Sequence, residues 1–128
     1  MLKGSSGQGR NVLIFVADGL RPSSVNPTDA PTLSSLRESG VNFTNSHSLF
    51  PTFTTPNASA IATGHYLGDT GDFSNTIYTG YPVFNGTNTP FIENDPVLGD
   101  IDNHFGGNYL NEETLLAYAR QNGYHTAA

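Results

Sequence analysis

The chain of 128 residues contains no cysteine, and only five of its residues are Lys or Arg. Without cysteine it has neither a disulfide framework nor a thiolate metal site, so a metal ion would have to be held by carboxylate, imidazole or hydroxyl groups. The few basic residues and the formal net charge of −6 argue against a nucleic-acid duplex as a partner, because binding a phosphate backbone requires clustered Lys and Arg.

Long apolar runs are also missing. No stretch approaches the roughly 18 consecutive apolar residues that a membrane-spanning helix requires, so we expect no membrane segment. Residues 1–10, MLKGSSGQGR, lack the apolar stretch of a signal peptide. We expect these residues to form a flexible lead-in.

The chain does contain a moderate share of apolar residues and many turn formers. Apolar residues make up 36% of the sequence, which also has 14 Gly and 8 Pro. This composition is typical of a folded domain in which turns and loops separate a few regular elements. At this length we expect one domain with its own core.

The segment 11–17, NVLIFVA, predicts a buried strand of a parallel sheet. Asp18 and Gly19 follow directly. Because ligands gather at the carboxyl ends of strands in open α/β sheets, Asp18 is a candidate metal ligand. The alternative is that Asp18 only begins a turn, in which Gly19 supplies the backbone freedom.

The segment 50–64, FPTFTTPNASAIATG, predicts a loop followed by a short helix from about Pro56 to a stop at Gly64. Thr54 and Thr55 would then lie at the N-terminus of this helix, where backbone N–H groups and the helix dipole favour negative charge. Their hydroxyls could act in catalysis, or they could simply cap the helix. This stretch alone leaves both functions open.

A strand–helix–strand unit would connect these two segments. The residues 31–39 predict a helix that Gly40 ends, and residues 41–48 predict a second strand. A right-handed crossover between parallel strands would bring the loop after the second strand to the same sheet edge as Asp18. Asp18 and Thr54 would then share one metal ion.

The part of the chain after Gly64 predicts a surface excursion with short β segments such as 76–78, followed by a long loop over 85–108. The acids in this part favour solvated turns over a calcium loop, because the glycine and distal Glu of an EF-hand are missing; they are Asp69, Asp72, Asp100 and Asp102. A further helix is predicted after Asn111, which would cap it, with a stop at Gly123. Residues 124–128 predict the start of another strand.

Taken in order, four segments resemble a known group of enzymes: the strand ending VADGLR, the helix PTLSSLRESG, the strand VNFTNSHSLF and the loop PTFTTPN. They resemble the N-terminal part of the alkaline phosphatase superfamily. The most similar branch is the type I phosphodiesterase and nucleotide pyrophosphatase group, whose nucleophile lies in a P-T-x-T-x-P-N loop. The resemblance covers most of residues 11–66. It implies an α/β fold, with the N-terminal part of a parallel sheet flanked by helices and a long loop or hairpin excursion.

The resemblance also implies roles for individual residues. Asp18 matches a metal ligand, Thr54 matches the nucleophile that also binds a metal, and Asn57 matches the amide that binds a phosphoryl oxygen. Thr55 places a second hydroxyl beside the nucleophile, which leaves open which threonine attacks. Sulfatase chemistry is disfavoured, because the chain lacks the modified cysteine of that group and has Asn57 where sulfatases carry an arginine.

The function implied is that of a metal-dependent phosphoric ester hydrolase, a phosphodiesterase, nucleotide pyrophosphatase or phosphatase, that acts on a small phosphorylated substrate through a phosphothreonine. Two divalent cations, with zinc favoured, and an extracytoplasmic or secreted location also follow from the resemblance. The relatives take their other metal ligands from later sequence, so we expect residues 11–128 to be an incomplete N-terminal portion of one catalytic domain and inactive alone. The alternatives are a non-catalytic α/β binding domain on the same scaffold, with both threonines as caps, and a mutase or transferase of the same superfamily.

Overall fold

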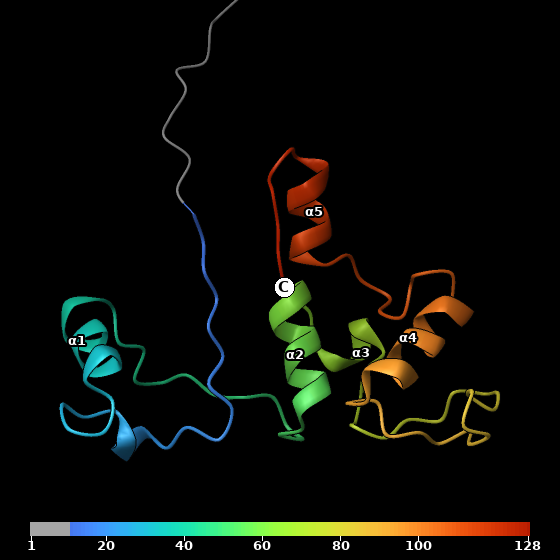
Figure 1. Cartoon of the computed structure of the whole chain (residues 1–128), viewed down its shortest axis with the longest axis horizontal. Helices are drawn as coiled ribbons and strands as arrows, with labels where there is room; N and C mark the ends of the chain where they lie inside the picture. Colours follow the sequence, from blue (N-terminus) through green and yellow to red (C-terminus); the bar gives the residue numbers. More distant parts are fainter. Residues whose placement is uncertain (1–10) are drawn as a thin grey trace, which may run out of the picture. The chain divides into compact units, whose positions relative to one another are not determined.

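The computed structural model describes residues 11–128, and residues 1–10, the expected lead-in, lie outside this range. The described residues divide into two compact units, one that ends at Asn45 and one of residues 46–128. Regular structure in the described part is helical (Figure 1). The elements are the 3-10 helix η1 (Pro22–Ser24) and the α-helices α1 (Pro31–Ser39), α2 (Thr54–Thr63), α3 (Leu67–Thr70), α4 (Asp95–His104) and α5 (Leu115–Gln121).

The predicted α/β fold with a parallel sheet is wrong. Residues 11–17, 41–48 and 124–128 form no strand, and the described residues contain only an isolated antiparallel bridge between Thr76 and Phe91. A strand of a parallel sheet requires neighbours that pair with its backbone and cover both of its faces. Here the side chains of Val12 and Leu13 are 84% and 90% exposed. Residues 11–128 therefore contain no sheet edge that could bring Asp18 and Thr54 together.

Helix α1 in the first unit has the bounds that the sequence predicts, Pro31–Ser39. Pro31 occupies the start of the helix, where its missing N–H costs no hydrogen bond. At the other end, the N–H of Gly40 donates to the carbonyl oxygen of Leu36 at 2.9 Å. The local signals for a helix start and stop are therefore sufficient here, although Leu36 remains exposed.

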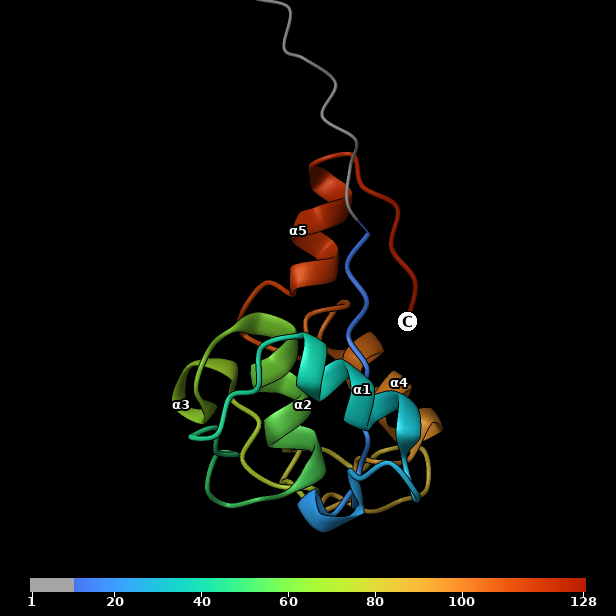
Figure 2. The same cartoon turned by 90° about the vertical axis from the view of Figure 1, so that its left-hand side faces the viewer.

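The core of the second unit lies between the 76–92 segment and α4. It consists of Val83, Ile92, Val97 and Ile101, all buried. Figure 2 shows this loop segment running beside α4. The prediction of a loop over 85–108 is wrong, since α4 lies within that range and carries two of the core residues. The side chain of Asn94 caps this helix by accepting a hydrogen bond from the N–H of Val97.

Helix α2 contacts both α3 and α5. Helix α5 was expected directly after Asn111, but it begins at Leu115 and its N-cap is Thr114, whose hydroxyl accepts from the N–H of Ala117. The N–H of Asn111 instead donates to the carbonyl oxygen of Thr70, at 3.1 Å. Asn111 therefore anchors the segment before α5 to the end of α3.

None of the helices in residues 11–128 has the length and apolar character needed to cross a membrane.

Candidate active site

The candidate nucleophile loop leads directly into α2, which begins at Thr54, two residues before the predicted start. Phe53 is the N-cap, with extended backbone angles, and no side chain caps this end of the helix. The interpretation of Thr54 and Thr55 as helix caps is therefore wrong. The predicted stop is confirmed, because Gly64 follows the last helical residue in the left-handed conformation, with φ of 76°.

The two adjacent threonines differ in their surroundings. Thr54 is exposed, and neither its hydroxyl nor its backbone N–H has a hydrogen-bond partner within residues 11–128. Thr55 is half-buried, and its hydroxyl lies 3.1 Å from Asp72 Oδ1, 3.1 Å from the Ser74 carbonyl oxygen and 3.2 Å from Asn75 Oδ1. The N–H of Thr55 also donates to Asn75 Oδ1, at 3.0 Å. Thr54 is thus the accessible hydroxyl of the pair.

Asn57 lies in the first turn of α2 and holds the preceding loop against the helix. Its Oδ1 accepts a hydrogen bond from the N–H of Leu49 at 2.8 Å. Its Nδ2 donates to the Phe53 carbonyl oxygen at 2.8 Å and to the Pro51 carbonyl oxygen at 3.4 Å. The side-chain amide is therefore engaged with backbone. Its binding of a phosphoryl oxygen stays a prediction, and that contact would replace the longer of the two donated bonds.

Asp18 is exposed and lies in a turn, in which the N–H of Leu20 donates to the carbonyl oxygen of Ala17 at 3.3 Å. Gly19 supplies the positive φ, 71°, that this turn requires. Asp18 belongs to the unit that ends at Asn45 and Thr54 to the unit of residues 46–128. Within residues 11–128, no three His, Cys, Asp or Glu side chains are grouped so that they could hold a metal ion.

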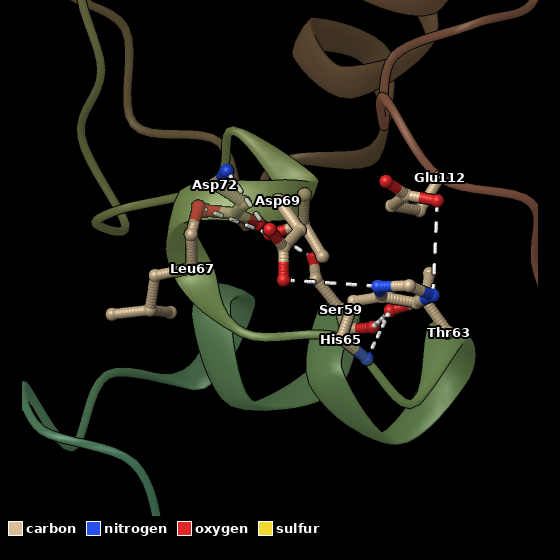
Figure 3. A network of polar contacts seen from close by, with 8 residues as sticks. Ser59, Thr63, His65, Leu67, Asp69, Asp72 and Glu112 are labelled. Carbon is tan, nitrogen blue, oxygen red and sulfur yellow. Dashed lines mark hydrogen bonds and ion pairs between the residues drawn. The ribbon is translucent and has the colours of Figure 1, made fainter.

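Asp72 is a buried carboxylate that sequence reasoning assigned to a solvated turn. Its side chain is 1% exposed. Asp72 Oδ2 accepts a hydrogen bond from Ser59 Oγ at 2.7 Å (Figure 3). Asp72 Oδ1 accepts one from Thr55 Oγ1. Burial, and then the nearby Asp72 carboxylate, raise the pKa of the Tyr109 phenol above its ordinary value. The phenol lies near Asp72 without hydrogen-bond geometry to any group in the described part of the chain.

His65 forms a second polar bridge close to α2. Its Nδ1 lies 3.7 Å from Asp69 Oδ2 and its Nε2 lies 3.7 Å from Glu112 Oε2 (Figure 3). The two carboxylates approach opposite nitrogens of the ring, so one metal ion bound to one nitrogen would not reach both. The geometry is that of a polar bridge between α3 and the segment before α5, which the sequence pattern did not indicate.

The other two acids considered for a calcium loop bind backbone groups. Asp100 Oδ2 accepts from the N–H of Phe84, and Asp102 Oδ1 accepts from the N–H of Tyr109, both at 3.1 Å. Each carboxylate therefore orders a loop against α4. A sequence pattern does not reveal these bonds, since the donors lie 16 and 7 residues away.

An open groove between α4 and α5 does not include the candidate nucleophile. Its volume is about 730 Å³, and Arg120 is the one basic residue among its lining residues, beside four acids. These acids are Asp95, Asp102, Glu112 and Glu113. Such a lining repels a phosphate anion. The exposed end of α2 is therefore the better candidate for phosphate chemistry.

Comparison with known proteins identifies one family. The family model of type I phosphodiesterase / nucleotide pyrophosphatase matches residues 12–128, a range that contains Asp18, Thr54 and Asn57. Comparisons with curated proteins and with solved structures gave no match. The match confirms the resemblance seen in the PTFTTPN loop and extends it over almost the whole chain. The chain therefore belongs to the type I phosphodiesterase / nucleotide pyrophosphatase family, a family of phosphoric ester hydrolases.

Proposed function

We propose that this chain carries the nucleophile of a metal-dependent phosphoric ester hydrolase, and that Thr54 attacks a small phosphorylated substrate to form a phosphothreonine. The observation that carries the proposal is the difference between Thr54 and Thr55 at the start of α2. Thr54 is exposed and without a hydrogen-bond partner within residues 11–128, whereas the Thr55 hydroxyl is engaged with Asp72. The family match supports the reaction class.

The position of Thr54 suits an attack on phosphorus. As Thr54 Oγ1 forms its bond to phosphorus, the hydroxyl gives its proton to solvent water, and the bond from phosphorus to the leaving oxygen breaks, so that the leaving group departs with the electron pair of that bond. Negative charge on the phosphoryl oxygens then lies near the N-terminus of α2, where the helix dipole and the unpaired N–H of Thr54 stabilise it. Asn57 would add a donor from the same turn, and water would release the phosphoryl group in a second displacement.

The chain exposes two oxygen donors of the kinds that divalent cations bind, although within residues 11–128 they form no complete metal site. Asp18 offers a carboxylate and Thr54 a hydroxyl, both exposed, and we propose that each binds a divalent cation, with two zinc ions as the favoured set. When bound, such a cation lowers the pKa of a coordinated hydroxyl and so makes it a better nucleophile. The remaining ligands are proposed to lie outside residues 11–128, so we expect this chain to complete the first phosphoryl transfer at most and to be inactive as a steady catalyst.

The test is covalent labelling of the chain in a single turnover. The wild-type chain, Thr54→Ala and Thr55→Val are incubated with zinc and nitrophenyl phosphate, quenched in acid and mapped by peptide mass spectrometry. We expect one phosphoryl group on Thr54 in the wild type and in Thr55→Val, and none in Thr54→Ala. A label on Thr52 or Thr55 in the wild type would move the nucleophile, and an unlabelled wild-type chain would reject the proposal.

The metal assignment has its own readout. Zinc titration followed by calorimetry should show weaker binding for Asp18→Asn than for the wild type. Asp29→Asn is the matched control, because Asp29 is an exposed acid of the same unit whose side chain accepts a hydrogen bond from Asn26. Equal zinc affinity in the wild type and Asp18→Asn would remove Asp18 from the metal site.

A further inference from the structure

Asp72 is a buried acid that the proposed reaction does not use. It follows Gly71, whose positive φ of 79° turns the chain at the end of α3. At 1% exposure its carboxylate has lost nearly all contact with water. Burying a carboxylate is costly unless hydrogen bonds replace its hydration.

The bonds come from α2. Thr55 and Ser59 lie four residues apart, on one face of the helix, and each donates its hydroxyl to a different oxygen of Asp72. The bond from Ser59, at 2.7 Å, has the usual length of an O–H···O hydrogen bond. Asp72 thus holds the first two turns of α2 from one side, as Figure 3 shows for Ser59.

This arrangement fixes the two threonines differently. Successive residues of an α-helix point about 100° apart around the axis. When Thr55 faces Asp72, Thr54 is therefore directed away from this anchor, and it is exposed. Asn75 strengthens the same anchor, because its Oδ1 accepts from the N–H of Thr55 at 3.0 Å. The Thr55 hydroxyl has one proton, and the acceptors around it are Asp72 Oδ1, the Ser74 carbonyl oxygen and Asn75 Oδ1.

We propose that Asp72 is a positioning residue that holds Thr55 as a structural anchor and thereby leaves Thr54 as the single reactive hydroxyl of the pair. The inference rests on the proposed threonine nucleophile. Asp72 does not touch the substrate; it acts through Thr55. The carboxylate is suited to this task because a hydrogen bond to a charged acceptor is roughly twice as strong as one to the neutral Asn75 amide or Ser74 carbonyl that also lie near Thr55.

The first experiment measures the side-chain conformation of both threonines by NMR scalar couplings, without a substrate. In the wild type we expect one χ1 rotamer for Thr55 and averaging for Thr54. Asp72→Ala should make Thr55 average as well. Asp72→Asn, which keeps the shape but offers a neutral acceptor, should give partial averaging, and it decides the question if Asp72→Ala does not fold. Asp69→Ala, an exposed acid three residues earlier, is the matched control and should change neither threonine.

An unchanged single rotamer of Thr55 in a folded Asp72 variant would overturn the proposal. The second experiment repeats the labelling with nitrophenyl phosphate. In Asp72→Ala, or in Asp72→Asn, we expect part of the phosphoryl label to move from Thr54 to Thr55, which a purely stabilising role of Asp72 would not cause. The proposal for Asp72 would also be overturned if the phosphoryl label stays wholly on Thr54 while Thr55 samples several χ1 rotamers. If the wild type takes no label, the phosphothreonine proposal fails, while the couplings still decide whether Asp72 anchors Thr55.

Discussion

Residues 11–45 bury no apolar side chain, whereas residues 46–128 bury a cluster of four aliphatic side chains while leaving others, such as Phe50, exposed. In the first range, Val12, Leu13 and Phe43 are all more than 75% exposed, although their sequence patterns are those of buried strands. In the second range, Ile92 and Ile101 are completely buried. The difference is whether partners lie nearby in the chain. The 76–92 segment and α4 are close in sequence and cover each other, whereas an isolated apolar strand pattern has nothing to pair with.

The same contrast holds for polar groups. The exposed Asp18 stands in a turn, while Asp72 is buried and takes hydroxyls from two turns of α2. The second unit is therefore held by a small apolar core and by buried hydrogen bonds together. Since α2 contributes the hydroxyls of these buried bonds, the candidate nucleophile belongs to the unit that contains them.

The strongest test of the comparison truncates one isoleucine in each unit. Ile101→Ala should cost about 2–5 kcal/mol of unfolding free energy, because it leaves a cavity beside Val83 and Val97. Ile14→Ala should cost less than about 0.5 kcal/mol, because Ile14 is 55% exposed. Urea unfolding followed by circular dichroism measures both. A cost for Ile14→Ala equal to that for Ile101→Ala would show that the 12–16 segment is packed in solution.

A smaller effect is expected from the buried hydroxyl of Ser59. Ser59→Ala removes the donor to Asp72 Oδ2 and should cost about 1.5–3 kcal/mol, the range for a hydrogen bond to a charged group. The control is Ser39→Ala in α1, whose hydroxyl donates to the Ser35 carbonyl oxygen at the surface. This control should change stability by less than about 0.5 kcal/mol. Equal costs would mean that the Asp72 bond adds no more than a surface bond.

The smallest effect concerns Tyr109 and appears only at alkaline pH. Its pKa is raised in the folded chain, so its contribution to stability is complete below the ordinary pKa of 10.0 and is lost as the pH rises above it. The loss is at most about 1.4 kcal/mol per pH unit. Tyr109→Phe should remove this loss and should be nearly neutral at pH 7, because the buried hydroxyl has no partner within residues 11–128.

Melting temperatures between pH 7 and 11 test this. Tyr118→Phe is the matched control, because Tyr118 is 58% exposed and its replacement should leave the alkaline loss intact. If the wild type and Tyr109→Phe lose stability in parallel above pH 10.0, the Tyr109 phenol is not the group responsible.

Local sequence signals predicted helix bounds well where residues at the helix ends determine them. Pro31 and Gly40 bound α1, and Gly64 ends α2. Helix α4 was missed although its signals are present, since Asn94 is a good N-cap and a proline occupies the first turn. The strand patterns failed for a different reason. A strand depends on partners that periodicity does not identify, so an apolar run such as 12–16 predicts burial that the structure does not provide.

The residues of the candidate site also divide into those that the sequence identified and those that it did not. The motif PTFTTPN singled out Thr54 and Asn57, whose roles stay predictions, while the family match supports the reaction class. The sequence could not reveal Asp72, because its hydroxyl donors lie 17 and 13 residues away. From the sequence alone, a buried acid in a Gly-rich turn cannot be distinguished from a solvated one. Only the fold of α2 against the α3 turn distinguishes them.

The three hydrogen bonds of Asn57 have a further consequence for ligand affinity. Because they fasten residues 49–53 to the first turn of α2, the backbone around Thr54 loses its freedom when the chain folds. An incoming phosphate ester then meets a preorganised surface, and little additional entropy is lost when the complex forms.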